Sequence, residues 1–156
     1  MRSLITKIIV CALLCLALGT ASSFSTMESI STWYQFLNKP AFNPPNWIFG
    51  PVWTILYIMM GISVALVWHT PHADRRKAMI FFAVQFILNL CWSFLFFNLH
   101  LPGVAYFEIM AMCISIALTI IAFYKINKTA ALLLLPYLCW VLFATILNYS
   151  IWILNR

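Results

Sequence analysis

Charged residues are scarce in this chain, and acidic ones are the scarcest. Only 8% of the 156 residues are charged, and Asp and Glu together occur three times. Hydrophobic residues make up 65% of the chain, and the mean hydropathy is +0.99. A soluble domain of this length could not bury so much apolar surface. The composition therefore excludes a soluble globular protein and predicts a single compact domain in a membrane.

A cysteine framework for metal or disulfide bonding is also missing. The five cysteines lie inside apolar segments, and no two of them form a Cys-x-x-Cys pair. Buried cysteines of this kind usually pack as small apolar side chains. We therefore expect no metal site.

The net charge of +6 does not indicate nucleic-acid binding. The nine basic residues lie at the ends of hydrophobic segments rather than along one stripe. Basic residues placed in this way set the orientation of a membrane protein. Seven of them fall in the first, third and fifth hydrophilic segments, namely Arg2, Lys7, Arg75, Arg76, Lys77, Lys125 and Lys128. We expect a bacterial-type cell membrane, with the N-terminus in the cytoplasm and the C-terminus outside.

Long apolar runs fill most of the chain and predict an all-α membrane protein with a bundle of five transmembrane helices. Residues 47–68, for example, contain no charge and are long enough to cross the hydrocarbon core of a bilayer. Pro136 predicts a kink in the last helix. The predicted helices cover about residues 5–25, 47–68, 78–99, 104–124 and 130–154 of one domain, 1–156.

The first apolar segment has two interpretations on residues alone. Arg2 and Lys7 precede an uncharged run, and residues 17–19 (Ala-Leu-Gly) resemble a cleavage site of a secretory signal. The same pattern is typical of a first membrane helix.

Residues 26–46 form a connector that is rich in aromatic residues and proline. Three prolines between residues 38 and 46 exclude an ordinary helix there. A flexible linker would instead be rich in Gly and Ser. We predict an ordered lid on the end of the bundle, with Asn46 capping the next helix and Pro51 near its first turn.

Three helices carry stripes of aromatic or polar residues at helical spacing. Such stripes either line a cavity or pack against neighbouring helices. Trp53, Tyr57 and Gly61 share one face, Gln85, Asn89 and Ser93 a second, and Trp140, Ala144, Leu147 and Asn148 a third. Glu108 lies about one turn inside its helix. It is interpreted either as a cavity group that affects ligand binding or as a side chain that bends outward to the interface, and we favour the second.

Three motifs resemble the tryptophan-rich sensory protein family, which is also called the translocator protein or peripheral benzodiazepine receptor family. They are W-Y-x-x-L-x-K-P-x-F-x-P-P-x-W-x-F-G-P-V-W-T-x-L-Y-x-x-M-G at 33–61, A-V-Q-F-I-L-N-L-x-W at 83–92 and L-P-Y-L-x-W-V-x-F-A-T-x-L-N-Y-x-x-W at 135–152. The resemblance implies a dimeric five-helix bundle that keeps its first helix. It also implies binding of porphyrins, sterols and synthetic isoquinoline or benzodiazepine ligands.

The resemblance assigns a ligand pocket to particular residues. By motif position, the ligand-binding residues are Tyr34, Pro44, Trp53, Tyr57, Asn89, Trp92, Trp140, Ala144 and Leu147. Flat π-systems stack on Trp and Tyr in such pockets. All three histidines fall in predicted loops, so haem iron has no obvious axial ligand and a metal-free porphyrin is the expected ligand. No cofactor is expected to be required.

Sterol binding is doubtful because the family's sterol motif is incomplete here. Family members with this motif carry Arg directly after L-N-Y-x-x-W, whereas this chain has Ile153. A second match at residues 118–128 is a weak pattern.

Three functions fit the resemblance. The first is a receptor or sensor for porphyrin-like tetrapyrroles. The second is an enzyme in which Trp53 and Trp140 donate electrons to a photo-excited porphyrin and so degrade it, although the sequence shows no other catalytic constellation. The third is a transporter, which five helices without an internal repeat fit poorly.

Overall fold

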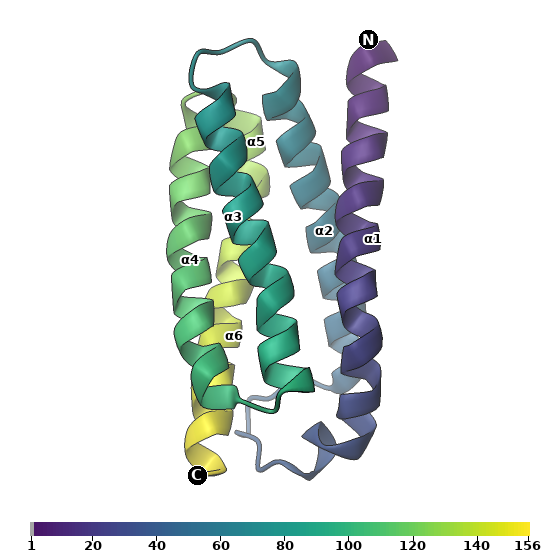
Figure 1. Cartoon of the computed structure of the whole chain (residues 1–156), viewed down its shortest axis with the longest axis vertical. Coiled ribbons are helices and arrows are strands. Elements are labelled where there is room, and N and C mark those ends of the chain that lie inside the picture. The colour runs from purple at the N-terminus through teal and green to yellow at the C-terminus, as the bar shows by residue number, and fades with distance from the viewer. Residues whose placement is uncertain (1) are drawn as a thin grey trace.

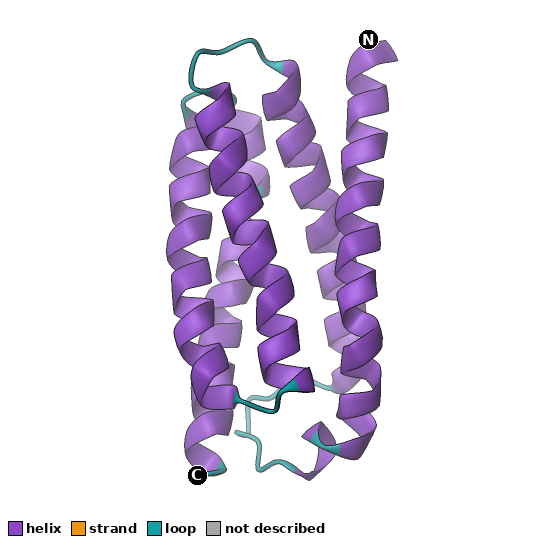
Figure 2. Cartoon of the chain, viewed as in Figure 1, coloured by secondary structure: helices purple, strands orange, loops and turns teal. Residues whose placement is uncertain are grey.

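The computed structural model describes residues 2–156, apart from the side chains of Arg2, Phe24 and Ser25. The described residues form helices and no strand (Figure 2). Five spans are long and apolar enough to cross a membrane, which confirms the predicted all-α membrane bundle. The elements are α1 (Arg2–Thr32), the 3-10 helix η1 (Tyr34–Phe36), α2 (Asn46–His69), α3 (Arg75–Ser93), the π-helix η2 (Phe94–Asn98), α4 (Pro102–Tyr124), α5 (Lys128–Leu133) and α6 (Leu135–Leu154).

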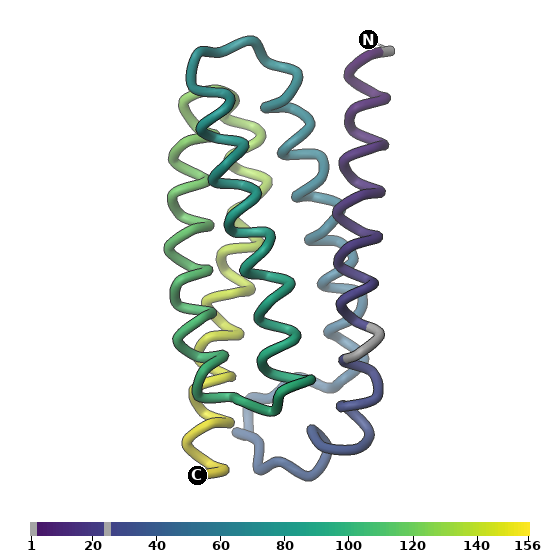
Figure 3. Tube along the Cα trace, viewed as in Figure 1, coloured from purple at the N-terminus to yellow at the C-terminus, as the bar shows by residue number. Residues whose placement is uncertain are grey.

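The two ends of the chain lie at opposite ends of the bundle (Figures 1 and 3). The connection between α2 and α3 lies at the same end as the N-terminus. Residues 37–45 and the turn between η2 and α4 lie at the other end, which we call the lid end. An odd number of spans requires this arrangement.

The helices α1 and α2 pack closely because glycines remove side chains at two points of contact. A Cβ at Gly61 would lie 2.6 Å from the backbone nitrogen of Ala12 and 2.8 Å from the carbonyl carbon of Cys11. A Cβ at Gly19 would overlap the ring of Tyr57. The first helix is therefore one wall of the bundle, and its contacts with α2 include Gly19 of the candidate cleavage site.

Gly61→Ala is expected to destabilise the protein, because the added methyl group forces the α1 backbone away from α2. Overpacking of this kind costs about 1–3 kcal/mol. Gly50→Ala is the matched control, since a Cβ at Gly50 has no atom within 4 Å. Thermal unfolding of both variants in one detergent checks this result. An unchanged midpoint for Gly61→Ala would contradict the close packing.

The first helix is longer than predicted, because it continues through Thr32 instead of ending near residue 25. Hydroxyl groups in its last turns bond to carbonyl groups one turn earlier, as the Thr32 hydroxyl does to Glu28 at 2.8 Å. Such bonds let Ser and Thr remain inside a helix. The end of α1 is also fixed by the Ser29 hydroxyl, which donates to the carbonyl of Phe97 at 2.6 Å. The beginning of the predicted lid is therefore helical.

Helix boundaries near prolines differ in detail from the predictions. The N-cap of α2 is Pro45, and no side chain caps the helix, so the predicted capping role of Asn46 is wrong. Pro51 is the sixth residue of α2 and so lies just after its first turn, which agrees with the prediction. The predicted interruption at Pro136 is present, because α5 ends at Leu133 and α6 begins at Leu135.

The predicted orientation is tested by labelling from outside the cell. Cysteines introduced at Ser31 and His72 lie at opposite ends of the bundle, and both positions are exposed. With an impermeant maleimide on intact cells, we expect Ser31→Cys to react and His72→Cys to remain unlabelled, each relative to the parent protein. The reverse pattern would invert the topology.

Candidate ligand-binding site

A cavity of about 400 Å³ lies between the helices at the lid end. Ligand pockets commonly span roughly 300–1,000 Å³, so this one can hold a small molecule. Four of the chain's tryptophans line it, namely Trp47, Trp53, Trp92 and Trp140. The cavity is thus an aromatic compartment within the bundle.

Aromatic rings of α2 and α6 form one wall. Trp53 and Tyr57 are one turn apart on α2, and their rings stack with centroids 5.5 Å apart. Trp140 of α6 meets Phe49 of α2 edge to face at 5.9 Å. Ala144 lies one turn after Trp140 and also lines the cavity. Its small side chain leaves space beside the large rings.

A buried hydrogen-bond network anchors this wall to the core. The Tyr57 hydroxyl donates to Oδ1 of Asn89 at 2.9 Å, and Nδ2 of Asn89 donates to the Tyr137 hydroxyl at 3.1 Å. The Tyr137 hydroxyl lies 3.6 Å from Sδ of Met112 and donates to it. These bonds join α2, α3, α6 and α4. They fix the orientation of the Tyr57 ring, which faces the cavity.

A second hydrogen-bonded pair fixes Trp92, the cavity-lining tryptophan of α3. Its indole nitrogen donates to Oδ1 of Asn148 at 3.0 Å. Nδ2 of Asn148 in turn donates to the carbonyl of Pro102 at 2.7 Å, at the start of α4. Both Trp92 and Asn148 line the cavity, so its polar groups here are already paired within the protein.

The lid is held by hydrogen bonds to the C-terminal end of α6. The backbone N–H of Asn38 donates to Oδ1 of Asn155, and Nδ2 of Asn155 donates to the carbonyl of Asn38, both at 2.9 Å. The buried Tyr34 hydroxyl donates to Oδ1 of Asn43 at 2.8 Å. Burial raises the pKa of Tyr34 to about 12, so the phenol keeps this donor at neutral pH.

The cavity brings together most of the residues that the sequence predicted, but not all. It is lined by Tyr34, Trp53, Tyr57, Trp92, Trp140, Ala144 and Leu147. Asn89 is not part of the lining, because both its polar groups are used in the buried network behind Tyr57. Pro44 is also outside the lining, where its carbonyl accepts a hydrogen bond from Asn43 at 3.0 Å. These two residues therefore support Tyr57 and Tyr34 rather than face the cavity.

Several lining residues were missed by the motif-based assignment. Trp47, Phe49 and Gly50 lie in the proline-rich motif, so their position in it was the available signal. The hydroxyl-bearing side chains of α1 gave no such signal, because none of the three family motifs lies in that helix. The missed residues are Thr20, Ser23, Thr26, Met27, Ile30, Asn46, Trp47, Phe49, Gly50, Thr54, Ser93, Phe96, Phe97, Asn148 and Ile151.

Among the described residues, three side chains inside the bundle have buried polar atoms without a hydrogen-bond partner. Both carboxylate oxygens of Glu108 are buried without a hydrogen bond, so the prediction that Glu108 bends outward to the interface is wrong. The amide of Gln85 is also buried and unpaired. Neither residue lines the cavity. The indole nitrogen of Trp140, by contrast, is an unpaired buried donor on a residue of the cavity wall.

Within residues 2–156, no three His, Cys, Asp or Glu side chains lie together as a metal site would require. His69, His72 and His100 are all absent from the cavity lining. The lining can therefore offer aromatic stacking and a few polar contacts, but no imidazole to an iron.

Comparison with known proteins gives the same family as the motifs. Residues 11–153 match the TspO/MBR family. The tryptophan-rich protein TspO of Archaeoglobus fulgidus is 44% identical over 151 residues, which cover 97% of this chain and 98% of that protein. The protein of the same name from Chlorobaculum tepidum is 45% identical, with 99% of each chain covered.

The similarity extends to animals. The human translocator protein is 38% identical over 123 residues, which cover 77% of this chain and 73% of that protein. The family match covers most of the chain, and the five apolar spans are those of an integral membrane protein. This multi-pass membrane protein therefore belongs to the TspO/MBR family.

Proposed function

We propose that the protein is a membrane receptor that binds a metal-free porphyrin-type tetrapyrrole in the cavity at the lid end. The observation that supports this most is the convergence of Trp47, Trp53, Trp92 and Trp140 on one cavity of about 400 Å³. Large flat π-systems are stabilised by stacking on such rings, in addition to the burial of their apolar surface. Synthetic isoquinoline or benzodiazepine-like molecules have the same flat aromatic character and fit the same proposal.

Quenching of tryptophan fluorescence by added protoporphyrin tests this proposal directly. Trp140→Phe keeps a ring in the wall but loses indole area. Stacking contributes about 0.5–1.5 kcal/mol, so affinity should fall by roughly tenfold or less. Trp68→Phe is the control, because Trp68 lies at the far end of α2 and does not line the cavity. Equal affinity in all three proteins would place the ligand elsewhere.

The alternative function is light-dependent degradation of the porphyrin. The same variant distinguishes it from simple binding. Trp140 lines the cavity, so its ring would lie beside a π-system that binds there. If Trp140 supplies electrons, Trp140→Phe will suppress porphyrin loss under light far more than it weakens binding in the dark. If binding and light-dependent loss of the porphyrin fall by the same factor, only the receptor function is supported. Uptake of porphyrin into proteoliposomes tests transport.

Weak sterol binding and the formation of a homodimer remain predictions from the sequence. Ile153, at the position that the sterol motif assigns to Arg, is 38% exposed on the outside of α6. Arg156 lies three residues later, with its guanidinium carbon 4.2 Å from the centroid of the Trp152 ring. The cation near the end of α6 therefore packs against Trp152.

A further inference from the structure

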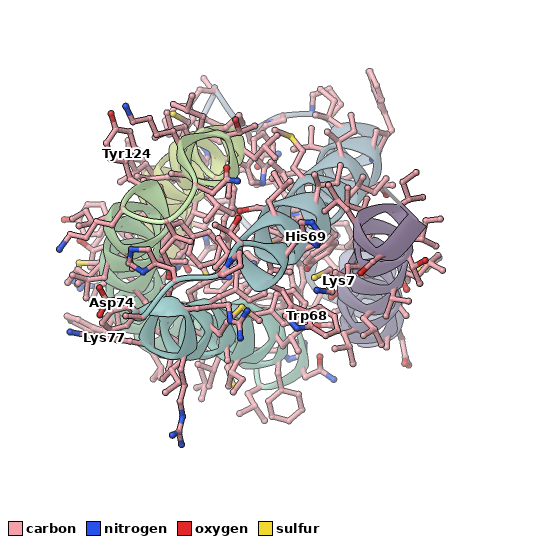
Figure 4. All side chains as sticks on the ribbon, turned by 90° about the horizontal axis from the view of Figure 1, so that it is seen from above. Lys7, Trp68, His69, Asp74, Lys77 and Tyr124 are labelled. Carbon is pink, nitrogen blue, oxygen red and sulfur yellow. The ribbon has the colours of Figure 1, made fainter. Side chains whose placement is uncertain are left out.

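The end of the bundle opposite the lid, which Figure 4 shows from above, carries several cations and few acids. Among the described side chains, the lysines and arginines there are Lys7, Arg75, Arg76, Lys77, Lys125 and Lys128. Asp74 is the one acid among the described residues of this end, and it lies 4.0 Å from His72. No described Lys or Arg side chain has a carboxylate within 4.0 Å. The positive charges of this end are thus not neutralised by carboxylates within the described part of the chain.

Two of these cations converge on one residue of α2. The Lys7 ammonium of α1 lies 5.0 Å from the centroid of the Trp68 ring. A guanidinium nitrogen of Arg75, at the start of α3, donates to the Trp68 carbonyl at 3.4 Å. Figure 4 shows Lys7, Trp68 and His69 beside one another at this end. Cationic side chains of α1 and α3 therefore both contact Trp68 of α2.

The position of Trp68 indicates what neutralises these charges. Trp68 is the second-last residue of its membrane span and is 42% exposed. Exposed tryptophans at the end of a span lie at the level of the lipid headgroups. Basic pockets between helices at this level bind anionic headgroups. A dissolved anion would gain nothing from the exposed indole ring, whereas a phospholipid contacts the ring and the cations together.

We propose that Lys7, Trp68 and Arg75 form a binding site for the phosphate group of an anionic phospholipid. The site lies on α1, α2 and α3 at the end opposite the cavity. None of its three residues lines that cavity, so this site is independent of the tetrapyrrole proposal. The phosphate lies between the ammonium and guanidinium groups, and the indole ring packs against the adjoining part of the lipid.

Titration of the purified, full-length protein in neutral detergent tests the site. Three ligands are added in parallel: short-chain phosphatidylglycerol, short-chain phosphatidylcholine and inorganic phosphate. Native mass spectrometry counts the bound lipid molecules. The midpoint of thermal unfolding is measured for each ligand. We expect saturable binding and a raised midpoint with phosphatidylglycerol alone. Each basic residue near an anionic lipid surface strengthens the binding of that lipid. Loss of one of them, in Lys7→Gln or Arg75→Gln, should therefore weaken the binding of phosphatidylglycerol about fivefold.

Two controls separate a built site from general surface charge. Lys125→Gln removes one charge from the same end, and Arg156→Gln removes the cation of a comparable Arg–Trp pair at the lid end. Both should keep the affinity of the parent protein. Lys7→Arg keeps the positive charge and should bind phosphatidylglycerol as the parent protein does. If Lys7→Gln does not fold, the loss of binding is measured with Arg75→Gln alone.

Three outcomes would overturn the proposal. An equal loss of affinity in Lys125→Gln would show unspecific attraction. Equal binding of phosphatidylcholine would remove the requirement for an anion. Equal stabilisation by inorganic phosphate would replace the lipid with a free ion.

Discussion

Ala144→Leu should weaken protoporphyrin binding by between about fivefold and a hundredfold, which is the largest effect expected of any single change in the cavity. Ala144 lines the cavity one turn from Trp140, and its side chain is 8% exposed. A leucine there fills space that the ligand needs. Overpacking a formed site costs about 1–3 kcal/mol, and each 1.4 kcal/mol is a factor of ten in affinity.

The matched control is Ala111→Leu on α4. Ala111 is exposed on the surface of the bundle and does not line the cavity, so the same enlargement there should leave binding unchanged. Fluorescence quenching and thermal unfolding of both variants give affinity and stability together. Binding that survives Ala144→Leu in a folded protein would contradict the assignment of the cavity.

Asn89→Leu should lower stability by about 1–3 kcal/mol, because it leaves the buried Tyr57 hydroxyl without an acceptor and the Tyr137 hydroxyl without a donor. Hydrogen bonds between membrane helices average only about 0.6 kcal/mol, but Asn89 makes two, and both partners are buried. For a protein of this size, the unfolding midpoint should fall by about 2–12 °C. Porphyrin affinity should also fall, since Tyr57 loses the bond that orients its ring.

A second substitution identifies the cause of this loss. Tyr57→Phe added to Asn89→Leu removes the unpaired hydroxyl, so the double variant should recover part of the stability. Gln85→Leu is the control on the same helix. The Gln85 amide is fully buried without a partner, so its replacement should leave stability unchanged or raise it. A loss in Gln85→Leu as large as that in Asn89→Leu would show that α3 tolerates no apolar replacement, and the network argument would fail.

The helical stripes show how far periodicity predicts a site. On α6, Trp140, Ala144, Leu147 and Asn148 lie at positions i, i+4, i+7 and i+8, and all of them line the cavity. On α3, Gln85, Asn89 and Ser93 are spaced strictly by four, and each such step turns the direction by about 40° around the helix. Ser93 therefore faces the cavity, Asn89 the network behind it and Gln85 the core.

Features that depend on contacts between distant segments were not predictable from the sequence. The position of the lid depends on Asn38 and Asn155, which are 117 residues apart in the chain. The π-helix η2 at the end of α3 is in contact with α1, where the Ser29 hydroxyl donates to the carbonyl of Phe97, 68 residues away in the chain. Helix number was predictable because each span needs only enough apolar residues to cross the bilayer.

The length of α1 determines where in the bilayer a bound molecule would lie. Its 31 residues, at 1.5 Å each, extend over about 46 Å, whereas the hydrocarbon core is roughly 30 Å thick. The cavity is lined by the second half of α1 and by the first half of α2, so it lies toward one leaflet instead of at the midplane. If the proposed porphyrin binds in this position, we expect its ring to lie in the apolar layer and its polar edge to face the water beyond the lid.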